Sequence, residues 1–451
     1  MTIKKVLFFL CFIPTFVFAQ SADNSPYSRF GFGDLINSQR VSSNGMGSLK
    51  SVFGDQYNTN FDNPATLTSL LNATYEGGVY AKYSELSSGA SSQTQWSGNI
   101  SYLSIAFPLK NQLTEALQKT PSKLKWVMGF NLAPYSTINY NLDEKRIVDS
   151  IGTVESLYTG TGGSYKLSMA NAVKYKNLSA GVNIGWLFGK SSYSRQISFV
   201  DIPVSYSDLF TDEYSVSGFA WKAGLTYQFD LSKSANGKEV IHPSRNLLIG
   251  VSGNGVQSFS TNQSYLYTRL NSTLQGTGNN TIDTFKISPV NGIDGKGKLP
   301  AEINIGLMYT HSPKLKLGID YNYSDWSSYK NDAKSDAGIV SYGTQSKIAA
   351  GIEYSPNPED YKYYFKRIRY RLGAYYANDP RKVNSIALDD KGISIGLGMP
   401  IRLPRQQIAF VHWAVELGQM GNTLSISEKY LRLHFAFTFS DTSWFYKRKY
   451  D

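Results

Sequence analysis

The residues best suited to chemistry in this sequence do not form a catalytic or metal-binding pattern. The four histidines, His242, His311, His412 and His434, show no metal-ligand spacing. The single cysteine, Cys11, lies in an apolar N-terminal run, so we expect neither a zinc-thiolate site nor a disulfide. The sequence also has no glycine-rich phosphate loop. We therefore predict that the protein is not an enzyme and that it holds no metal and no other cofactor.

Charged side chains instead alternate with apolar ones. Between Glu428 and Phe439, Leu or Phe recurs at every second position, and the residues between them include Arg432 and His434. A period of two predicts a strand with one apolar and one polar face. The segments 300–309, 314–324 and 347–354 alternate in the same way. In a soluble sheet the charged face would meet water, whereas in a transmembrane barrel it would meet the lumen.

In the barrel interpretation, the polar strand faces place charges of both signs inside. Because buried charges must be paired, we expect an ion-pair network that holds an N-terminal segment to the barrel wall. The alternative is a selectivity lining for a polar solute, and the interspersed signs favour the network. The residues predicted to point inward are Glu302, Lys316, Asp320, Lys347, Glu353, Arg369, Arg371, His412, Glu416, Arg432 and His434.

The chain begins with the features of a secretory signal peptide. Lys4 and Lys5 precede the apolar run 6–18, and Ala19 supplies a small residue for cleavage. A run of ~13 apolar residues is too short for a membrane-spanning helix, and no later run reaches ~18. Loss of residues 1–19 would lower the formal net charge from +11 to +9. The remaining charges are scattered or clustered at turns, which argues against nucleic acid as a partner.

From Tyr75 onward, fourteen segments have the pattern of strands, and soluble all-β domains seldom exceed ~250 residues. The connections alternate between short ones, at 176–177, 311–313 and 403–406, and long polar ones, at 141–163, 263–298, 327–346 and 379–390. This alternation is typical of outer-membrane barrels. We predict an all-β fold: a transmembrane antiparallel β-barrel of about 14 strands over residues 75–439, with a short periplasmic tail at 440–451. The segments start near Tyr75, Ser97, Lys125, Ser164, Ser179, Ser215, Asn246, Pro300, Lys314, Lys347, Arg367, Lys391, Gln407 and Glu428.

Short motifs, taken in order, resemble the FadL/TodX family of outer-membrane channels for hydrophobic compounds. They occur at 62–65, 162–169, 218–227, 299–306 and 317–327. The resemblance implies that residues 20–74 form a hatch, or plug, inside the lumen, with Asn63, Pro64 and Ala65 as its motif. The stretches 25–35 and 444–451 are similar to the Bacteroidetes branch, which includes channels of no established substrate and the PorV-type subunits of the type IX secretion machinery.

In that family, a kink in the third strand opens a lateral passage from the lumen to the bilayer. Gly129 and Pro134 lie in the third predicted strand here. Proline removes a ladder hydrogen bond and glycine permits a bulge, so we place the predicted opening there. The alternative is that Pro134 only marks the strand end near the outer rim.

The basic and aromatic turn 362–371 and the basic tail 447–449 are expected at the inner rim. There they would anchor the barrel to anionic headgroups and to the aromatic belt. Docking of a periplasmic partner is the alternative.

The sequence thus predicts an outer-membrane, FadL-like channel for passive uptake of hydrophobic or amphipathic small molecules, gated by the hatch. The alternative is a non-conducting barrel that serves as a partner subunit of a larger secretion or assembly machine. The short connection 198–212 and the polar connection 141–163 favour this alternative, because neither resembles the hydrophobic hairpins that capture ligand in the fatty-acid transporters. The expected partners are outer-membrane lipid together with a hydrophobic ligand, other proteins, or both.

Overall fold

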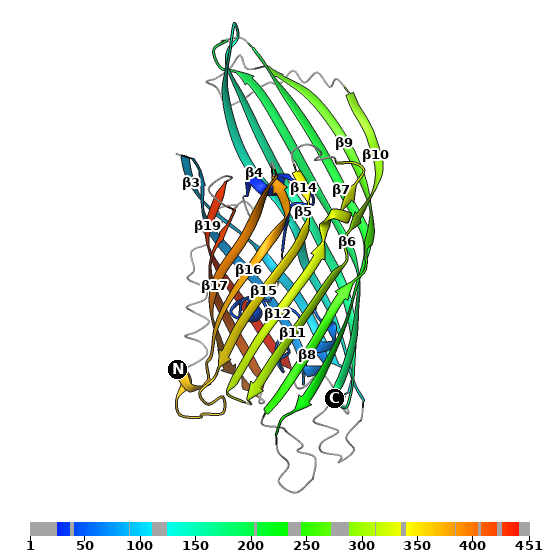
Figure 1. Ribbon diagram of the computed structural model, residues 1–451, viewed down its shortest axis with the longest axis vertical. Helices are drawn as coiled ribbons and strands as arrows, with labels where there is room; N and C mark the ends of the chain where they lie inside the picture. The colour runs from blue at the N-terminus through cyan, green and yellow to red at the C-terminus, as the bar shows by residue number, and fades with distance from the viewer. Residues whose placement is uncertain are drawn as a thin grey trace, which may run out of the picture.

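The computed structural model describes residues 25–36, 40–89, 91–110, 124–202, 205–232, 245–271, 288–311, 313–334, 340–383, 385–404, 407–421 and 426–441. The described chain is nearly all β-strand, and the strands form one antiparallel sheet that closes where β19 pairs with β2 (Figure 1). The predicted signal peptide and the basic tail 447–449 lie outside the described residues. In the part that is described, no helix has the length and hydropathy needed to cross a membrane.

Within these residues, fourteen antiparallel strands make up the barrel, which confirms the prediction. Ten of them are single elements, and four consist of two pieces in line: β8 with β9, β10 with β11, β12 with β13, and β14 with β15. The bounds are β2 Ala73–Ser88, β3 Ser91–Pro108, β4 Leu124–Val148, β5 Gly152–Tyr175, β6 Leu178–Phe199, β7 Tyr206–Asp230, β8 Arg245–Asn254, β9 Gln257–Asn271, β10 Ser288–Leu299, β11 Glu302–His311, β12 Leu315–Asp325, β13 Lys330–Asn331, β14 Val340–Tyr342, β15 Thr344–Tyr354, β16 Arg369–Val383, β17 Ile386–Arg402, β18 Ile408–Met420 and β19 Ser427–Asp441.

The alternation of side chains gives the barrel an apolar outer surface. In β19, Leu433 and Phe437 are 36% and 45% exposed, whereas His434 and Thr438 between them are 4% and 0% exposed. Ile303 and Ile305 of β11 point outward in the same way. Since a continuous apolar belt is unfavourable in water, this is the surface that lipid covers in a transmembrane barrel.

The predicted long outer connections are largely wrong. Residues 141–163 are not a loop, because β4 and β5 continue through them and pair as far as Val148 and Gly152. Strand also covers most of 379–390 and of 198–212, and parts of 263–298 and 327–346. Along residues 141–159 every residue is partly or fully exposed, so neither face of the sheet has to be apolar and the period of two is lost. The ladder continues nonetheless, and β4 to β7, β9 and β10 rise above the rest of the barrel (Figure 1).

Residues 25–36 and 40–72 lie inside the barrel. They contain four short elements: η1 Pro26–Arg29, β1 Asp34–Leu35, α2 Val41–Asn44 and η2 Pro64–Ser69. The predicted helix at 65–71 corresponds to η2, which begins at a proline, as suits the first helical turn. The two remaining short helices are η3 Trp326–Ser328 and η4 Tyr364–Arg367, in the connections of the wall. We call residues 25–36 and 40–72 the inner segment.

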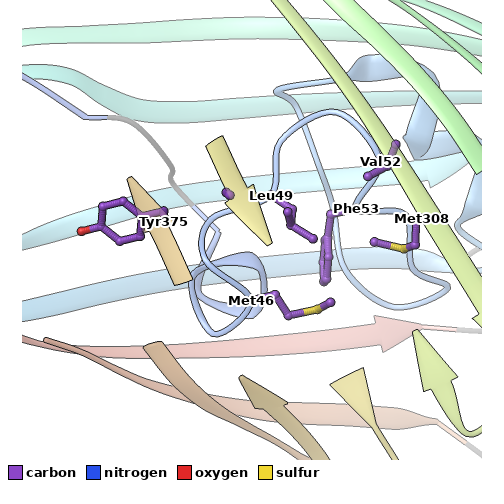
Figure 2. Close-up of a cluster of buried hydrophobic side chains, with 7 residues drawn as sticks. Met46, Leu49, Val52, Phe53, Met308 and Tyr375 are labelled. Atoms are coloured by element: carbon purple, nitrogen blue, oxygen red, sulfur yellow. The ribbon is translucent and has the colours of Figure 1, made fainter. Parts of the chain in front are cut away.

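The inner segment supplies much of the hydrophobic core. Met46, Leu49, Val52 and Phe53 are each at most 1% exposed. Figure 2 shows these side chains together with Met308 of β11 and Tyr375 of β16, and Ala349 of β15 also belongs to the cluster. The core therefore lies in the lumen, between the inner segment and the wall, rather than between two sheets.

Candidate functional site: the filled lumen and the open ladder

The Asn63-Pro64-Ala65 motif packs tightly against the wall. The amide of Asn63 accepts a hydrogen bond from the backbone N–H of Ala65 at 3.2 Å and donates one to the carbonyl of Ser51 at 2.6 Å. Gly224 of β7 and Gly181 of β6 make room for the motif, because a Cβ on Gly224 would collide with the Asn63 side chain and one on Gly181 would lie 2.6 Å from the Ala65 nitrogen. The motif thus fixes η2 against β6 and β7.

Asp55 of the inner segment joins two wall strands. Its carboxylate lies 2.9 Å from Lys316 Nζ and 2.6 Å from Arg369 Nη1. Glu353 continues the network, with Lys316 at 3.0 Å and Arg371 at 2.7 Å. Burial opposes ionisation of Asp55, but Arg369 and Lys316 outweigh it and hold the pKa of that carboxyl well below its usual range.

Two further groups of predicted inward residues also meet the inner segment. Glu416 pairs with Arg432 at 3.1 Å and with His434 at 3.2 Å, and His434 contacts the amide of Asn44 at 3.3 Å. Asp320 accepts hydrogen bonds from the backbone N–H groups of Lys50 and Ser51.

Glu302 lies 3.2 Å from Lys222 and 3.6 Å from Lys50. Of the eleven residues predicted to point inward, the nine described so far each contact the inner segment or another of the nine. His412 contacts Arg371 and Asn58 of the inner segment, and Lys347 lies buried over the ring of Tyr375.

Sequence reasoning missed the partners that the inner segment itself contributes. Arg40 is 1% exposed, donates to Asn131 Oδ1 at 2.7 Å and stacks on Tyr102 at 4.1 Å from the ring centroid. Asp34 pairs with Arg381 of β16 at 2.7 Å. The usable signal was the short set of charges in the segment predicted as a hatch, since each would need an opposite charge or a hydrogen-bonding partner on the wall: Asp23, Arg29, Asp34, Arg40, Lys50, Asp55 and Asp62.

The ladder between β3 and β4 is open in its outer half. The two strands pair only from Pro108–Val127 to Leu103–Leu132. Beyond that rung, within the described residues, β3 continues in register with β2 alone and β4 with β5. The inner segment takes the place of β3 along this part of β4, through the pairing of β1 with Ser136 and Thr137.

Two more backbone hydrogen bonds extend this contact. The N–H of Ile36 donates to the carbonyl of Tyr135 at 3.1 Å, and that of Ser25 donates to Asn139 at 2.8 Å. The inner segment therefore satisfies part of the edge of β4 that β3 leaves open.

The two residues predicted to mark a lateral opening have different positions. Pro134 lies just above the last β3–β4 rung, next to a register shift between Pro134 and Ser136 in the β4–β5 ladder. Gly129 lies below the opening, fully paired with Ala106 and Ala170. A Cβ on Gly129 would lie 2.9 Å from the ring of Phe61, so this glycine makes room for the inner segment.

A cavity that offers water-sized molecules about 120 Å³ lies behind the opening. Ser101 of β3, Thr137 of β4 and Ile36 of the inner segment form part of its wall. Charged pairs complete the lining, among them Lys82 with Glu428 at 2.6 Å. The described residues contain no group of three or more His, Cys, Asp or Glu placed to hold a metal ion. The site is thus suited to binding a molecule with both polar and apolar parts.

Comparison with known proteins identifies one family. A family model described as BamG matches residues 1–451. None of the curated protein sequences compared with the chain matches it significantly.

Several solved structures are similar in fold. A FadL homologue from Pseudomonas aeruginosa has a TM-score of 0.58 at 12% identity, over 90% of this chain and 99% of that one. The toluene transporter TodX of Pseudomonas putida has a TM-score of 0.54 at 12% identity, over 91% and 99%. The CymD monoaromatic hydrocarbon channel has a TM-score of 0.52 at 14% identity, again over 91% and 99%. At these identities the likeness shows only the shared fold, a β-barrel of the FadL type.

Proposed function

For this chain, which belongs to the BamG family, we propose the role of a FadL-like channel of the outer membrane. It would admit hydrophobic or amphipathic small molecules through the open ladder between β3 and β4. The observation that carries the proposal is the loss of β3–β4 pairing beyond Leu103 and Leu132, directly in front of the cavity lined by Ser101 and Thr137. The channels for hydrocarbons and toluene with a similar fold support the same class of ligand.

The surfaces beside the opening suit a ligand that moves between lumen and bilayer. Trp96, Ile100 and Leu103 of β3 and Phe130 and Leu132 of β4 are exposed on the outer face. A hydrophobic molecule that leaves sideways into lipid keeps its apolar surface out of water, which is worth about 25 cal/mol per Å². Release into the periplasm through an aqueous lumen would forfeit this gain.

The inner segment would act as the gate. Its β1 strand pairs with β4 at the inner side of the opening, and Ile36 lines the cavity behind it. Backbone groups at membrane depth must be satisfied, so movement of β1 away from β4 requires water or ligand to replace its hydrogen bonds. Opening would therefore be coupled to ligand entry.

A reversible cross-link tests this gate. Leu35 and Ser136 are directly paired across β1 and β4, at the Cα separation that a disulfide accepts. The double variant Leu35→Cys, Ser136→Cys should take up a hydrophobic fluorescent probe when reduced and lose uptake when oxidised. A matched control joins Ile393 to Leu417, an outward-facing pair of β17 and β18 far from the opening. Equal uptake by the oxidised and reduced forms of the first variant would disprove gating by β1.

The second candidate function is that of a partner subunit in a larger outer-membrane machine. The buried ion pairs of Asp55 hold the inner segment at the wall, which favours a permanently filled lumen. The outer extensions of β4 to β7 also provide a sheet surface that lies beyond the apolar belt. Purification from native membranes in mild detergent distinguishes the two functions. A stable complex of high mass, together with no probe uptake by the isolated barrel, would favour the subunit.

A further inference from the structure

A second region of the lumen has an unusual charge. Two adjoining cavities, which offer water-sized molecules about 70 and 80 Å³, lie between the inner segment and wall strands from β4 to β15. They share Ile36, Lys50, Tyr135, Lys166 and Glu302 in their linings. We refer to the two together as the basic chamber.

The basic chamber has an excess of positive charge. Its ionised lining residues are four lysines and two carboxylates, a formal balance of 4 − 2 = +2: Lys50, Lys166, Lys222, Lys347, Asp62 and Glu302. The large cavity behind the β3–β4 opening is different. There, four cations face five carboxylates, a balance of −1 with histidine neutral: Lys82, Lys347, Arg381, Arg432, Asp34, Asp379, Asp390, Glu416 and Glu428. The positive excess is therefore local to the basic chamber.

Two of the four lysines have no carboxylate partner. Glu302 forms ion pairs with Lys222 at 3.2 Å and with Lys50 at 3.6 Å. Within the described part of the chain, Lys166 and Lys347 form no ion pair. Their ammonium groups lie over aromatic rings instead, Lys166 at 4.5 Å from the centroid of Tyr135 and Lys347 at 4.2 Å from that of Tyr375.

Burial of the charge costs more free energy at Lys347, because its side chain is almost entirely buried, with 6% of the residue exposed. A buried charge is expensive unless it is paired, and a ring face supplies only a partial negative potential. An anion in the cavity that both lysines line would remove this cost. Glu416 and Asp390 line the neighbouring cavity, but both lie beyond ion-pair distance from Lys347.

A neutral donor in the same lining also lacks a partner. Asn322 of β12 is 7% exposed, and neither its amide nitrogen nor its amide oxygen makes a hydrogen bond within the described residues. Buried amides are nearly always satisfied, so an unsatisfied one facing a cavity indicates a missing ligand atom or water. Asn322 is paired with Lys347 across β12 and β15, and both residues line the same cavity as Lys166. A cavity lined by one amide N–H₂ group and two ammonium groups suits an oxygen with negative charge.

We propose that the basic chamber is a binding site for an oxyanion, a phosphate or carboxylate group, held by Lys166 and Lys347 with Asn322 as a neutral donor. The group can belong to a free anion or to the head of an acidic amphiphile. This proposal rests on the residues that line the basic chamber and is independent of transport through the β3–β4 opening.

Binding to the purified full-length protein in uncharged detergent tests the proposal. Inorganic phosphate and dodecyl phosphate are titrated separately by calorimetry and by thermal unfolding, since a ligand that binds only the folded state raises Tm. We expect saturable binding of at least one of them, weakened about tenfold or more by Lys347→Gln and by Lys166→Gln, because each variant removes a charged hydrogen bond. Lys391→Gln, at an exposed position on the outer face of β17, is the matched control and should change nothing.

The two titrations distinguish the sources of the anion. Binding of both ligands with equal affinity assigns the site to a free oxyanion, and clearly tighter binding of dodecyl phosphate assigns it to the head of an amphiphile. Failure of the wild-type protein to bind either one overturns the proposal, as does binding that both lysine variants retain in full. Heat-modifiable gel mobility confirms that the variants are folded, and Asn322→Ala gives a further variant that leaves the charges intact.

Discussion

Removal of the charge of Asp55 should release the inner segment without unfolding the barrel. The substitution Asp55→Asn keeps the shape of the side chain but leaves Arg369 without its carboxylate and Lys316 with Glu353 alone. Loss of one member of a buried ion pair costs about 3–5 kcal/mol. Because the side chains of Lys316 and Arg369 remain 20% and 15% exposed, water screens part of this cost, and we expect about 2–3 kcal/mol.

Amide hydrogen exchange measures this loss directly. A cost of about 2–3 kcal/mol corresponds to a roughly 30- to 150-fold faster exchange through local opening. The change should be greatest at Tyr57, whose N–H donates to Asp55, and should extend to neighbouring amides of the inner segment. Strand amides in β17 and β18 should keep their protection. The control Asp143→Asn, at an exposed pair with Lys145 outside the lumen, should have no effect.

The pH dependence has a defined sign. The pKa of Asp55 is lowered in the folded protein. Its contribution to the stability of the inner segment is therefore complete above the ordinary pKa of about 4, and it is lost progressively as the pH falls from there towards the lowered pKa. Wild-type exchange at low pH, corrected for intrinsic rates, should therefore approach that of the variant. Identical protection of the inner segment in Asp55→Asn and wild type at neutral pH would refute the reasoning and would show that apolar packing alone holds the segment.

Three other outcomes follow from the same geometry. Leu433→Arg on the lipid-facing side of β19 should cost about 2–4 kcal/mol and impair assembly, seen as loss of heat-modifiable gel mobility. Ile147→Arg should be tolerated, since Ile147 is 82% exposed in the outer extension of β4. Equal loss of assembly in the Leu433→Arg and Ile147→Arg variants would contradict the position assigned to the apolar belt. Gly224→Val should displace Asn63 and make the inner segment sensitive to limited proteolysis. Resistance equal to that of the wild type would show that the Asn63-Pro64-Ala65 motif does not depend on the space at Gly224.

The barrel could be predicted from the sequence because lipid and lumen impose opposite polarity on successive residues. Leu433 and His434 show this alternation directly, and it correctly gave the strand number. The same alternation led to the prediction of inward charges such as Glu353 and Arg371, both of which are buried. The outer extensions could not be predicted in this way. Water covers both faces of the sheet there, so the paired residues Lys145 and Glu155 look like loop residues. Hydrogen bonding of the ladder, rather than side-chain burial, keeps them extended.

The candidate site was predicted only in part, because its geometry depends on contacts distant in sequence. Alternation placed Arg369 and Lys316 inside, but their joint partner Asp55 became evident only once the inner segment was seen to fill the lumen. Of the two residues proposed to mark the opening, Pro134 lies just beyond the last β3–β4 pair. Gly129, predicted to permit a bulge, instead makes room for the ring of Phe61. The pairing of β1 with Ser136 has no local sequence signal.

The most direct measurement of the central claim is the map of contacts made by a hydrophobic probe. A photoreactive monoaromatic probe is cross-linked to the protein in native outer membranes, with and without excess unlabelled competitor, and the adducts are located by mass spectrometry. The account predicts competable adducts on β3 and β4 beside the opening and on cavity residues such as Ser101 and Thr137. Adducts spread evenly around the apolar belt, with none inside the lumen and none lost to competitor, would contradict it.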